Sequence, residues 1–116
     1  MSHFTIYHNP RCSKSRQTLA LLEENGVEPE IVLYLQDSPS RDELKSIIGK
    51  LGITARELLR KGEDAYKELG LKDSSLDDEA LIDAMLTQPK LIERPIVIHA
   101  DKAVLGRPPE NVLELL

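Results

Sequence analysis

The sequence predicts an α/β fold in a single domain, and three patterns carry this prediction. A strand–helix–strand pattern begins the chain, helical patterns fill its middle, and two strand patterns followed by a helix end it. The chain has 116 residues, which suits one domain, and 41 % of them are hydrophobic, which is enough for a packed core. We therefore expect one domain over residues 1–116, because no repeat or linker divides it.

The first third of the chain has the pattern of a βαβ unit. Residues 3–8 are rich in β-branched and aromatic side chains, and Asn9-Pro10 ends this strand-like run. Residues 13–25 carry leucines among polar residues and are followed by a glycine, which predicts a helix. The apolar run at residues 31–35 is typical of a strand buried on both faces. Together these patterns predict two parallel strands joined by a helix.

The middle of the chain predicts helices only. Ser40-Arg41-Asp42-Glu43 has the spacing of a capping box, in which the serine and the glutamate satisfy free backbone amides at a helix start. Thr54-Ala55-Arg56-Glu57 repeats this spacing and predicts a second helix, which carries Leu58-Leu59-Arg60. Two further helices are expected, one over about residues 63–69 and one from near Ser75 to just before Pro89.

The last part of the chain predicts a β-hairpin followed by a helix. Residues 96–99 and 102–105 are strand-like and flank a short turn at Ala100-Asp101. Pro108-Pro109 can open a last helix, because proline is tolerated in a first turn. When the helical insertion at about residues 40–88 is set aside, the order that remains is that of a thioredoxin-like core, βαβ followed by ββα.

Composition excludes several classes of function. The net charge is −5 and the chain has no Trp, whereas a nucleic-acid binder would be expected to carry a basic face and aromatic platforms. No apolar run approaches the roughly 20 residues that cross a bilayer, and residues 1–8 lack the pattern of a signal peptide. One cysteine cannot form an internal disulfide. We therefore expect a cytoplasmic protein that binds neither nucleic acid nor membrane.

The strongest local feature is the segment from His8 to Arg16, His-Asn-Pro-Arg-Cys-Ser-Lys-Ser-Arg, between the first strand and the first helix. Cys12 lies at the helix start, where unpaired amides and the helix dipole favour a thiolate. The flanking arginines and lysine add positive charge, and the serines can donate hydrogen bonds to the sulfur or to a bound anion. Loop amides at a helix start also bind anions. The segment therefore predicts a nucleophile and an oxyanion site together.

Cys12 could instead be a small buried residue, which is the commonest role of a lone cysteine. Its polar, cationic neighbours at a strand-to-helix turn favour the reactive interpretation. Ser15 excludes a Cys-x-x-Cys pair, and Thr18 stands where the phosphate loop of low-molecular-weight phosphatases has arginine. The lone cysteine and three scattered histidines provide no metal-ligand spacing. An external thiol such as glutathione must therefore release any oxidised or covalent form of Cys12.

Four motifs are spaced along the chain: the His-Asn-Pro-x-Cys loop, Leu58-Leu59-Arg60, the segment from Leu91 to Val97, and Gly106-Arg107-Pro108-Pro109. Together they resemble the glutaredoxin-coupled arsenate reductase family over essentially the whole chain. The resemblance implies that Cys12 attacks arsenate as a thiolate. It further implies that an arginine triad, Arg60, Arg94 and Arg107, surrounds the oxyanion and that His8 and Ser15 help to activate the thiol.

The resemblance also implies the order of the reaction. A thiol–arsenate adduct forms first, glutathione attacks it, and glutaredoxin completes the reduction to arsenite. Glutathione is then a co-substrate, and no bound cofactor is expected. Guanidinium forks suit tetrahedral oxyanions through paired hydrogen bonds. Arg94 precedes Pro95, and in thioredoxin-like folds that proline is typically cis and faces the active site.

Other interpretations stay open beside the resemblance. On the residues alone, Arg60 could be a solvated helix residue, Arg107 a surface charge and His8 a solvated residue at a strand end. Ser13-Lys14 stands where the type members of the family have Gly-Thr, and this departure bears on substrate identity. Spx-type regulators share the fold and bind RNA polymerase, although they commonly carry a Cys-x-x-Cys switch. A glutathione-dependent thiol transferase acting on another substrate is the third alternative.

Overall fold

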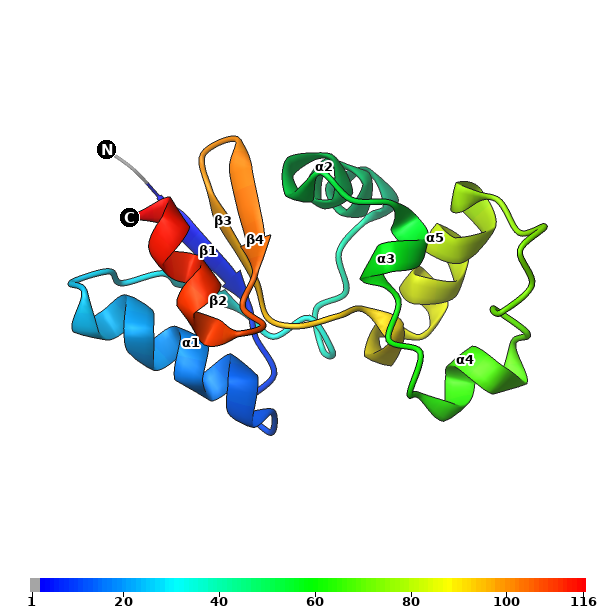
Figure 1. Ribbon diagram of the computed structural model, residues 1–116, viewed down its shortest axis with the longest axis horizontal. Coiled ribbons are helices and arrows are strands. Elements are labelled where there is room, and N and C mark those ends of the chain that lie inside the picture. Colours follow the sequence, from blue (N-terminus) through cyan, green and yellow to red (C-terminus); the bar gives the residue numbers. More distant parts are fainter. Residues whose placement is uncertain (1–2) are drawn as a thin grey trace. The chain divides into compact units, whose positions relative to one another are not determined.

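The computed structural model describes residues 3–116 and divides the chain into two compact units (Figure 1). The first, here called the sheet unit, consists of the chain up to Asp37 together with Arg94–Leu116. The second, the helical unit, is Ser38–Glu93 and contains the insertion predicted at about residues 40–88. That residues 1–116 fold as one domain stays a prediction. In the described part of the chain, no helix has the length and apolarity to span a membrane.

The sheet unit is built on four strands in the order β2-β1-β3-β4. β1 pairs with β2 in parallel, and the pairs β1–β3 and β3–β4 are antiparallel. This sheet and its helix confirm the predicted α/β, thioredoxin-like class. The elements are β1 (Phe4–Tyr7), α1 (Ser13–Glu24), β2 (Glu30–Val32), β3 (Ile96–His99), β4 (Lys102–Leu105) and the 3₁₀ helix η2 (Pro109–Leu115).

The core of the sheet unit lies between the two central strands and two helices. Ile6 of β1 is paired in register with Val97 of β3, and neither side chain is exposed. Leu22 of α1, Val112 and Leu115 of η2 pack against them. Helices α1 and η2 also contact each other, as Figure 1 shows. Burial of these aliphatic side chains is the main force that holds the unit together.

The prediction that residues 31–35 form a strand buried on both faces is wrong. β2 ends at Val32, and the backbone N–H groups of Gln36 and Asp37 donate to the carbonyl oxygen of Leu33 in a turn. Ile31 is 48 % exposed because β2 lies at the edge of the sheet and has one neighbouring strand only. A continuous apolar run therefore marks an edge strand and its following turn here.

The helical unit has the predicted order of helices, with different boundaries. Both capping boxes form: the Ser40 and Thr54 side chains accept from the N–H groups of Glu43 and Glu57, whose carboxylates bond back. The last α-helix starts later than predicted, because Asp77 caps it and Ser75 instead bonds the Asp73 carboxylate. The elements are α2 (Arg41–Leu51), α3 (Ala55–Leu58), α4 (Asp64–Glu68), α5 (Asp78–Thr87) and the 3₁₀ helix η1 (Pro89–Leu91).

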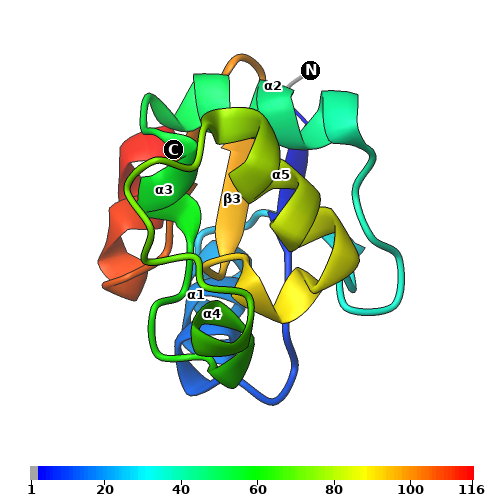
Figure 2. The ribbon, with the colours of Figure 1, turned by 90° about the vertical axis from the view of Figure 1, so that its right-hand side faces the viewer.

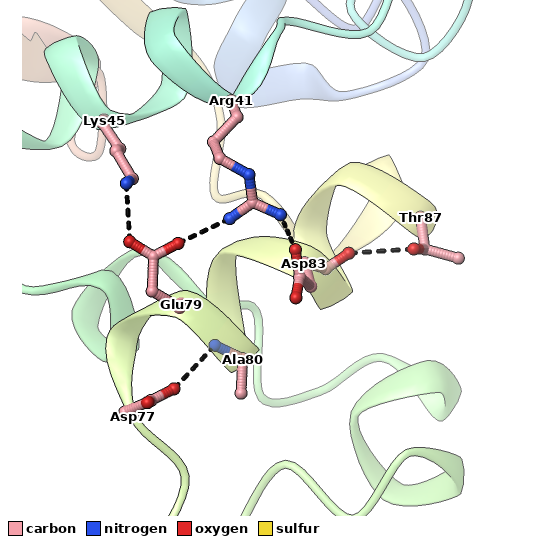
Figure 3. Close-up of polar contacts among 7 residues, drawn as sticks. All are labelled: Arg41, Lys45, Asp77, Glu79, Ala80, Asp83 and Thr87. Atoms are coloured by element: carbon pink, nitrogen blue, oxygen red, sulfur yellow. Dashed lines mark hydrogen bonds and ion pairs between the residues drawn. The ribbon is translucent and has the colours of Figure 1, made fainter.

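Within the helical unit, α5 packs on α2 and α3 (Figure 2). The α2–α5 contact carries a network of exposed ion pairs (Figure 3). Arg41 pairs with Glu79 at 2.7 Å and also with Asp83, and Lys45 pairs with Glu79 at 2.6 Å. Exposed pairs of this kind are screened by salt, so buried leucines rather than these charges hold the helices together.

Candidate active site

Cys12 occupies the N-cap position of α1, as the sequence predicts. Its backbone is extended, with φ −94° and ψ 123°, and the side chain is partly exposed. A tight turn leads into it, because the Cys12 N–H donates to the Asn9 carbonyl oxygen at 3.0 Å. The Asn9 side chain holds the same turn by accepting from the Arg11 N–H at 3.0 Å. The sulfur is thus presented at the start of a helix, on a turn fixed by local hydrogen bonds.

The thiol of Cys12 is biased toward its ionised form. Burial acts to raise its pKa, but the backbone N–H of Ser15, the guanidinium of Arg94 and the N–H of Lys14 together lower the pKa below its ordinary value. Arg94 acts both through its charge and through a hydrogen bond. The alternative of an inert, buried cysteine does not fit these surroundings, because a lowered pKa enriches the nucleophilic thiolate.

His8 and Ser15 form a buried pair beneath the turn. His8 Nδ1 lies 2.6 Å from Ser15 Oγ, and Ser15 Oγ accepts a further hydrogen bond from the Asn9 N–H at 3.0 Å. The His8 side chain is 6 % exposed and Ser15 is fully buried. Burial, with a smaller effect of the Arg16 charge, lowers the pKa of His8, so the ring is neutral at pH 7. A neutral ring whose Nδ1 is unprotonated accepts a hydrogen bond from the Ser15 hydroxyl. This direction agrees with the Asn9 contact, in which Ser15 Oγ is the acceptor.

Arg94 enters β3 through a cis peptide bond to Pro95. Pro95 is held from the other side, because its carbonyl oxygen accepts from the Gly106 N–H at 2.9 Å. Thr18 of α1 donates to the Gly106 carbonyl oxygen at 3.3 Å and to that of Lys14 at 2.8 Å. The start of α1, the Arg94-Pro95 bond and the end of β4 are therefore tied together, and this tie places Arg94 for its interaction with Cys12.

Arg60 belongs to the helical unit and forms ion pairs with two glutamates. Its guanidinium pairs with Glu93 at 3.0 Å and with Glu63 at 3.7 Å, and its side chain is 20 % exposed. The prediction that Arg60 lies on a helix is wrong: α3 ends at Leu58, and the Arg60 N–H donates to the Leu91 carbonyl oxygen at 2.7 Å. This extended segment, in which Leu59 bridges Ile92, takes the place of the predicted helical turn.

Arg107 is exposed and follows Gly106 in the sheet unit, where a cis bond joins it to Pro108. Of the six predicted site residues, the structure brings Cys12 and Arg94 together and pairs His8 with Ser15. Sequence reasoning missed Glu93 as a partner of Arg60 and Thr18 as a tie to Gly106. Glu93 lies in the Leu91–Val97 motif, next to Arg94, and its acidic side chain is a signal in the sequence, whereas nothing in the sequence marks Thr18. Among residues 3–116, no group of three or more potential metal ligands occurs.

The sheet order, the cysteine at the start of α1 and the proline that opens β3 define a thioredoxin-like protein. The chain belongs to the ArsC family, whose family model matches residues 7–115.

Three known proteins illustrate the similarity. The solved structure of an arsenate reductase from Vibrio cholerae superposes with a TM-score of 0.96 and 55 % identity, covering 98 % of each chain. The arsenate reductase of Neisseria meningitidis serogroup A is 50 % identical over 117 residues, which span the whole of both chains. YfgD of Escherichia coli K12, an uncharacterized protein, is 62 % identical over 112 residues, covering 96 % of this chain and 94 % of YfgD.

Proposed function

We propose that this protein is a single-cysteine arsenate reductase that draws its electrons from glutathione and glutaredoxin. The observation that carries the proposal is the Cys12 thiol, whose pKa is lowered at the α1 start by backbone amides and by Arg94. The names of its relatives at about half identity support arsenate as the substrate. The absence of a second cysteine in the sequence supports an external thiol, and we assign the reaction to the cytoplasm, where such thiols are kept reduced.

The first step is attack of the Cys12 thiolate on arsenic. A sulfur–arsenic bond forms, one arsenic–oxygen bond breaks, and the oxygen leaves as water after taking up protons. Glutathione then attacks the adduct, and glutaredoxin completes the reduction. Overall, one dihydrogen arsenate, two thiols and one proton give arsenous acid, one disulfide and one water, so arsenic gains the two electrons that the sulfurs lose.

The other residues receive roles that follow from their charge and contacts. Arg94 stabilises the thiolate before the attack and the transferred negative charge on the oxyanion during it. Neutral His8 and Ser15 fix the turn that presents Cys12 and can relay a proton. Arg60 and Arg107 as further ligands of arsenate stay predictions, and Glu93 beside Arg60 would compete for its guanidinium.

The deciding experiment follows arsenate-dependent NADPH oxidation with glutathione, glutathione reductase and glutaredoxin, comparing wild type with Cys12→Ser. We expect turnover from wild type and none from the variant, because a serine hydroxyl is not ionised at pH 7. Lys72→Glu, a charge reversal at an exposed position of the helical unit, serves as the control and should retain turnover.

Other outcomes would point to the alternative functions. Wild type that is inactive on arsenate but reduces glutathione mixed disulfides through Cys12 would identify a thiol transferase. Inactivity in both assays together with stoichiometric binding of purified RNA polymerase would identify a regulator. Either result would overturn the arsenate reductase proposal.

A further inference from the structure

A pocket of about 270 Å³ opens in the sheet unit beside the turn that leads to Cys12. One side is formed by the segment His8–Arg11, which directly precedes the cysteine. The other side is formed by Leu33, Leu35 and Gln36, from the turn that follows β2. None of the residues on this second side has a role in the proposed reaction.

The topology of the sheet explains why a pocket forms there. β1 and β2 are parallel, so their carboxyl ends lie at the same edge of the sheet, and the His8 N–H extends their ladder by donating to the Val32 carbonyl oxygen at 2.9 Å. Beyond this bond the two segments of the chain separate into different turns. One turn ends at Cys12 and the other begins at Leu33. Loops that a rigid scaffold holds in place are common sites of binding residues.

The chemistry of the lining favours a small anionic peptide. Arg11 supplies an exposed guanidinium, Asn9 and Gln36 supply side-chain amides, and Leu33 and Leu35 supply apolar surface. None of the described residues that line the pocket is acidic. A second pocket of the sheet unit, between α1 and η2, is lined by Glu24 and Glu110 and would repel the same ligand. The volume of the first pocket, about 270 Å³, lies just below the range usual for ligand sites, which suits part of a tripeptide rather than all of it.

We propose that this pocket binds the peptide part of the resolving thiol, with glutathione as the ligand. The inference rests on the proposed function, which requires an external thiol at Cys12. Glutathione carries two carboxylates and one ammonium group, so its net charge is negative at neutral pH. A carboxylate pairs with Arg11, the methylene groups contact Leu33 and Leu35, and the thiol is left to approach the neighbouring Cys12.

Binding is tested without turnover by titrating ¹⁵N-labelled protein with S-methylglutathione, whose blocked sulfur cannot react. We expect saturable shifts of the Asn9, Arg11, Leu35 and Gln36 amide signals in wild type. Arg11→Glu and, separately, Leu35→Asp should weaken the binding at least fivefold. Lys72→Glu makes the same charge reversal as Arg11→Glu on the helical unit and should leave the binding unchanged.

Steady-state kinetics provide a second readout. Arg11→Gln, which removes the positive charge without placing a negative one beside Cys12, should raise the KM for glutathione at least fivefold and leave the rate of Cys12 alkylation unchanged, because Arg11 is not among the groups that lower the pKa of that thiol. Saturable shifts centred on Gly106 and Arg107, or no saturable shifts in wild type, would overturn the inference even if arsenate is reduced. If arsenate is not reduced but S-methylglutathione binds at the Cys12 turn, the inference stands and the proposed function fails.

Discussion

At the scale of single residues, Arg94 and Cys12 form a thiolate–guanidinium pair whose effect can be separated from substrate binding. Alkylation by iodoacetamide follows the thiolate, so its pH profile should have a midpoint below the ordinary value of 9.0. Arg94→Gln removes the positive charge and should move the midpoint to higher pH, slowing alkylation at pH 7. The profile is measured in the absence of arsenate.

Arg107→Gln is the matched control for this experiment. Arg107 is not among the groups that lower the pKa of Cys12, so its removal should leave the alkylation profile in place. An unchanged profile in Arg94→Gln would show that the backbone amides alone set the state of the thiol.

His8 gives a second prediction at this scale. Its folded-state pKa is lowered from 6.5 by burial and by Arg16, so the unfolded chain binds a proton that the folded chain does not. The stability should therefore fall as the pH drops from about 6.5 toward the lowered pKa of His8. Urea unfolding between pH 7 and pH 5 measures this, and His8→Gln should flatten the dependence.

The matched comparison is His3, whose side chain is exposed. His3→Gln should leave the pH dependence of unfolding as steep as in wild type. A dependence that survives His8→Gln would assign it to carboxyl groups instead.

At the scale of elements, Gly106 is the contact point between the end of β4, the start of α1 and the cis Arg94-Pro95 bond. A Cβ atom added there would lie 2.7 Å from Pro95 Cγ and 2.9 Å from Thr18 Cγ2, distances that require one of them to shift. Gly106→Ala should therefore destabilise the protein by about 1–3 kcal/mol, the usual cost of overpacking. Because Arg94 precedes this contact, the alkylation midpoint of Cys12 should also rise.

Gly49→Ala provides the control in the interior of α2. A Cβ at that position has no neighbour within 4 Å, and alanine is the better helix former. Urea denaturation should show a gain of about 0.5–1 kcal/mol. Equal losses in both variants would contradict the assigned packing of Gly106.

The elements that sequence reasoning predicted correctly are those encoded by neighbouring residues. The capping boxes at Ser40 and Thr54 and the position of Cys12 at a helix start depend on spacings of a few residues. The errors arose where long-range pairing decides the structure. Residues 31–35 looked like a central strand, but their place at the sheet edge depends on β3 and β4, which follow more than sixty positions later.

In the candidate site, too, the features set by neighbouring residues could be predicted and those set by long-range contacts could not. Cys12 and its amide donors are close together in the sequence, and Arg94 could be predicted because its motif resembles that of the family. The backbone of Arg60 could not, because its N–H bonds Leu91 across the helical unit. Thr18 is one polar residue among many on α1, and only the tertiary structure shows that it bonds Gly106.

At the scale of the whole molecule, the predicted single domain implies that the sheet unit and the helical unit unfold together. The helical unit has its own fully buried residues, among them Leu44, Leu58, Leu81 and Met85. Domains of about 60 residues bury only about 60 % of the surface that their unfolded chain exposes, and they are marginally stable alone. We therefore expect the helical unit to unfold with the sheet unit in one transition, as the predicted single domain requires.

Leu81→Ala tests this expectation by hydrogen exchange. The loss of a buried leucine costs about 2–5 kcal/mol, and the slowest amides of β1 and β3 should lose protection to the same extent as those of α5. Leu69→Ala, at a leucine that is 49 % exposed, is the control and should change little. Loss of protection confined to Ser38–Glu93 would show that the two units unfold independently.

The close packing at Gly106 also bears on how this sequence can diverge. Thr18, Pro95 and Gly106 are distant in sequence but occupy one space, so a change at one alters which changes the others tolerate. A side chain at position 106 costs less stability where bulk at position 18 has already been lost or the proline has already moved. Substitutions at these three positions are therefore epistatic. The volume available to the three side chains together favours some orders of substitution over others.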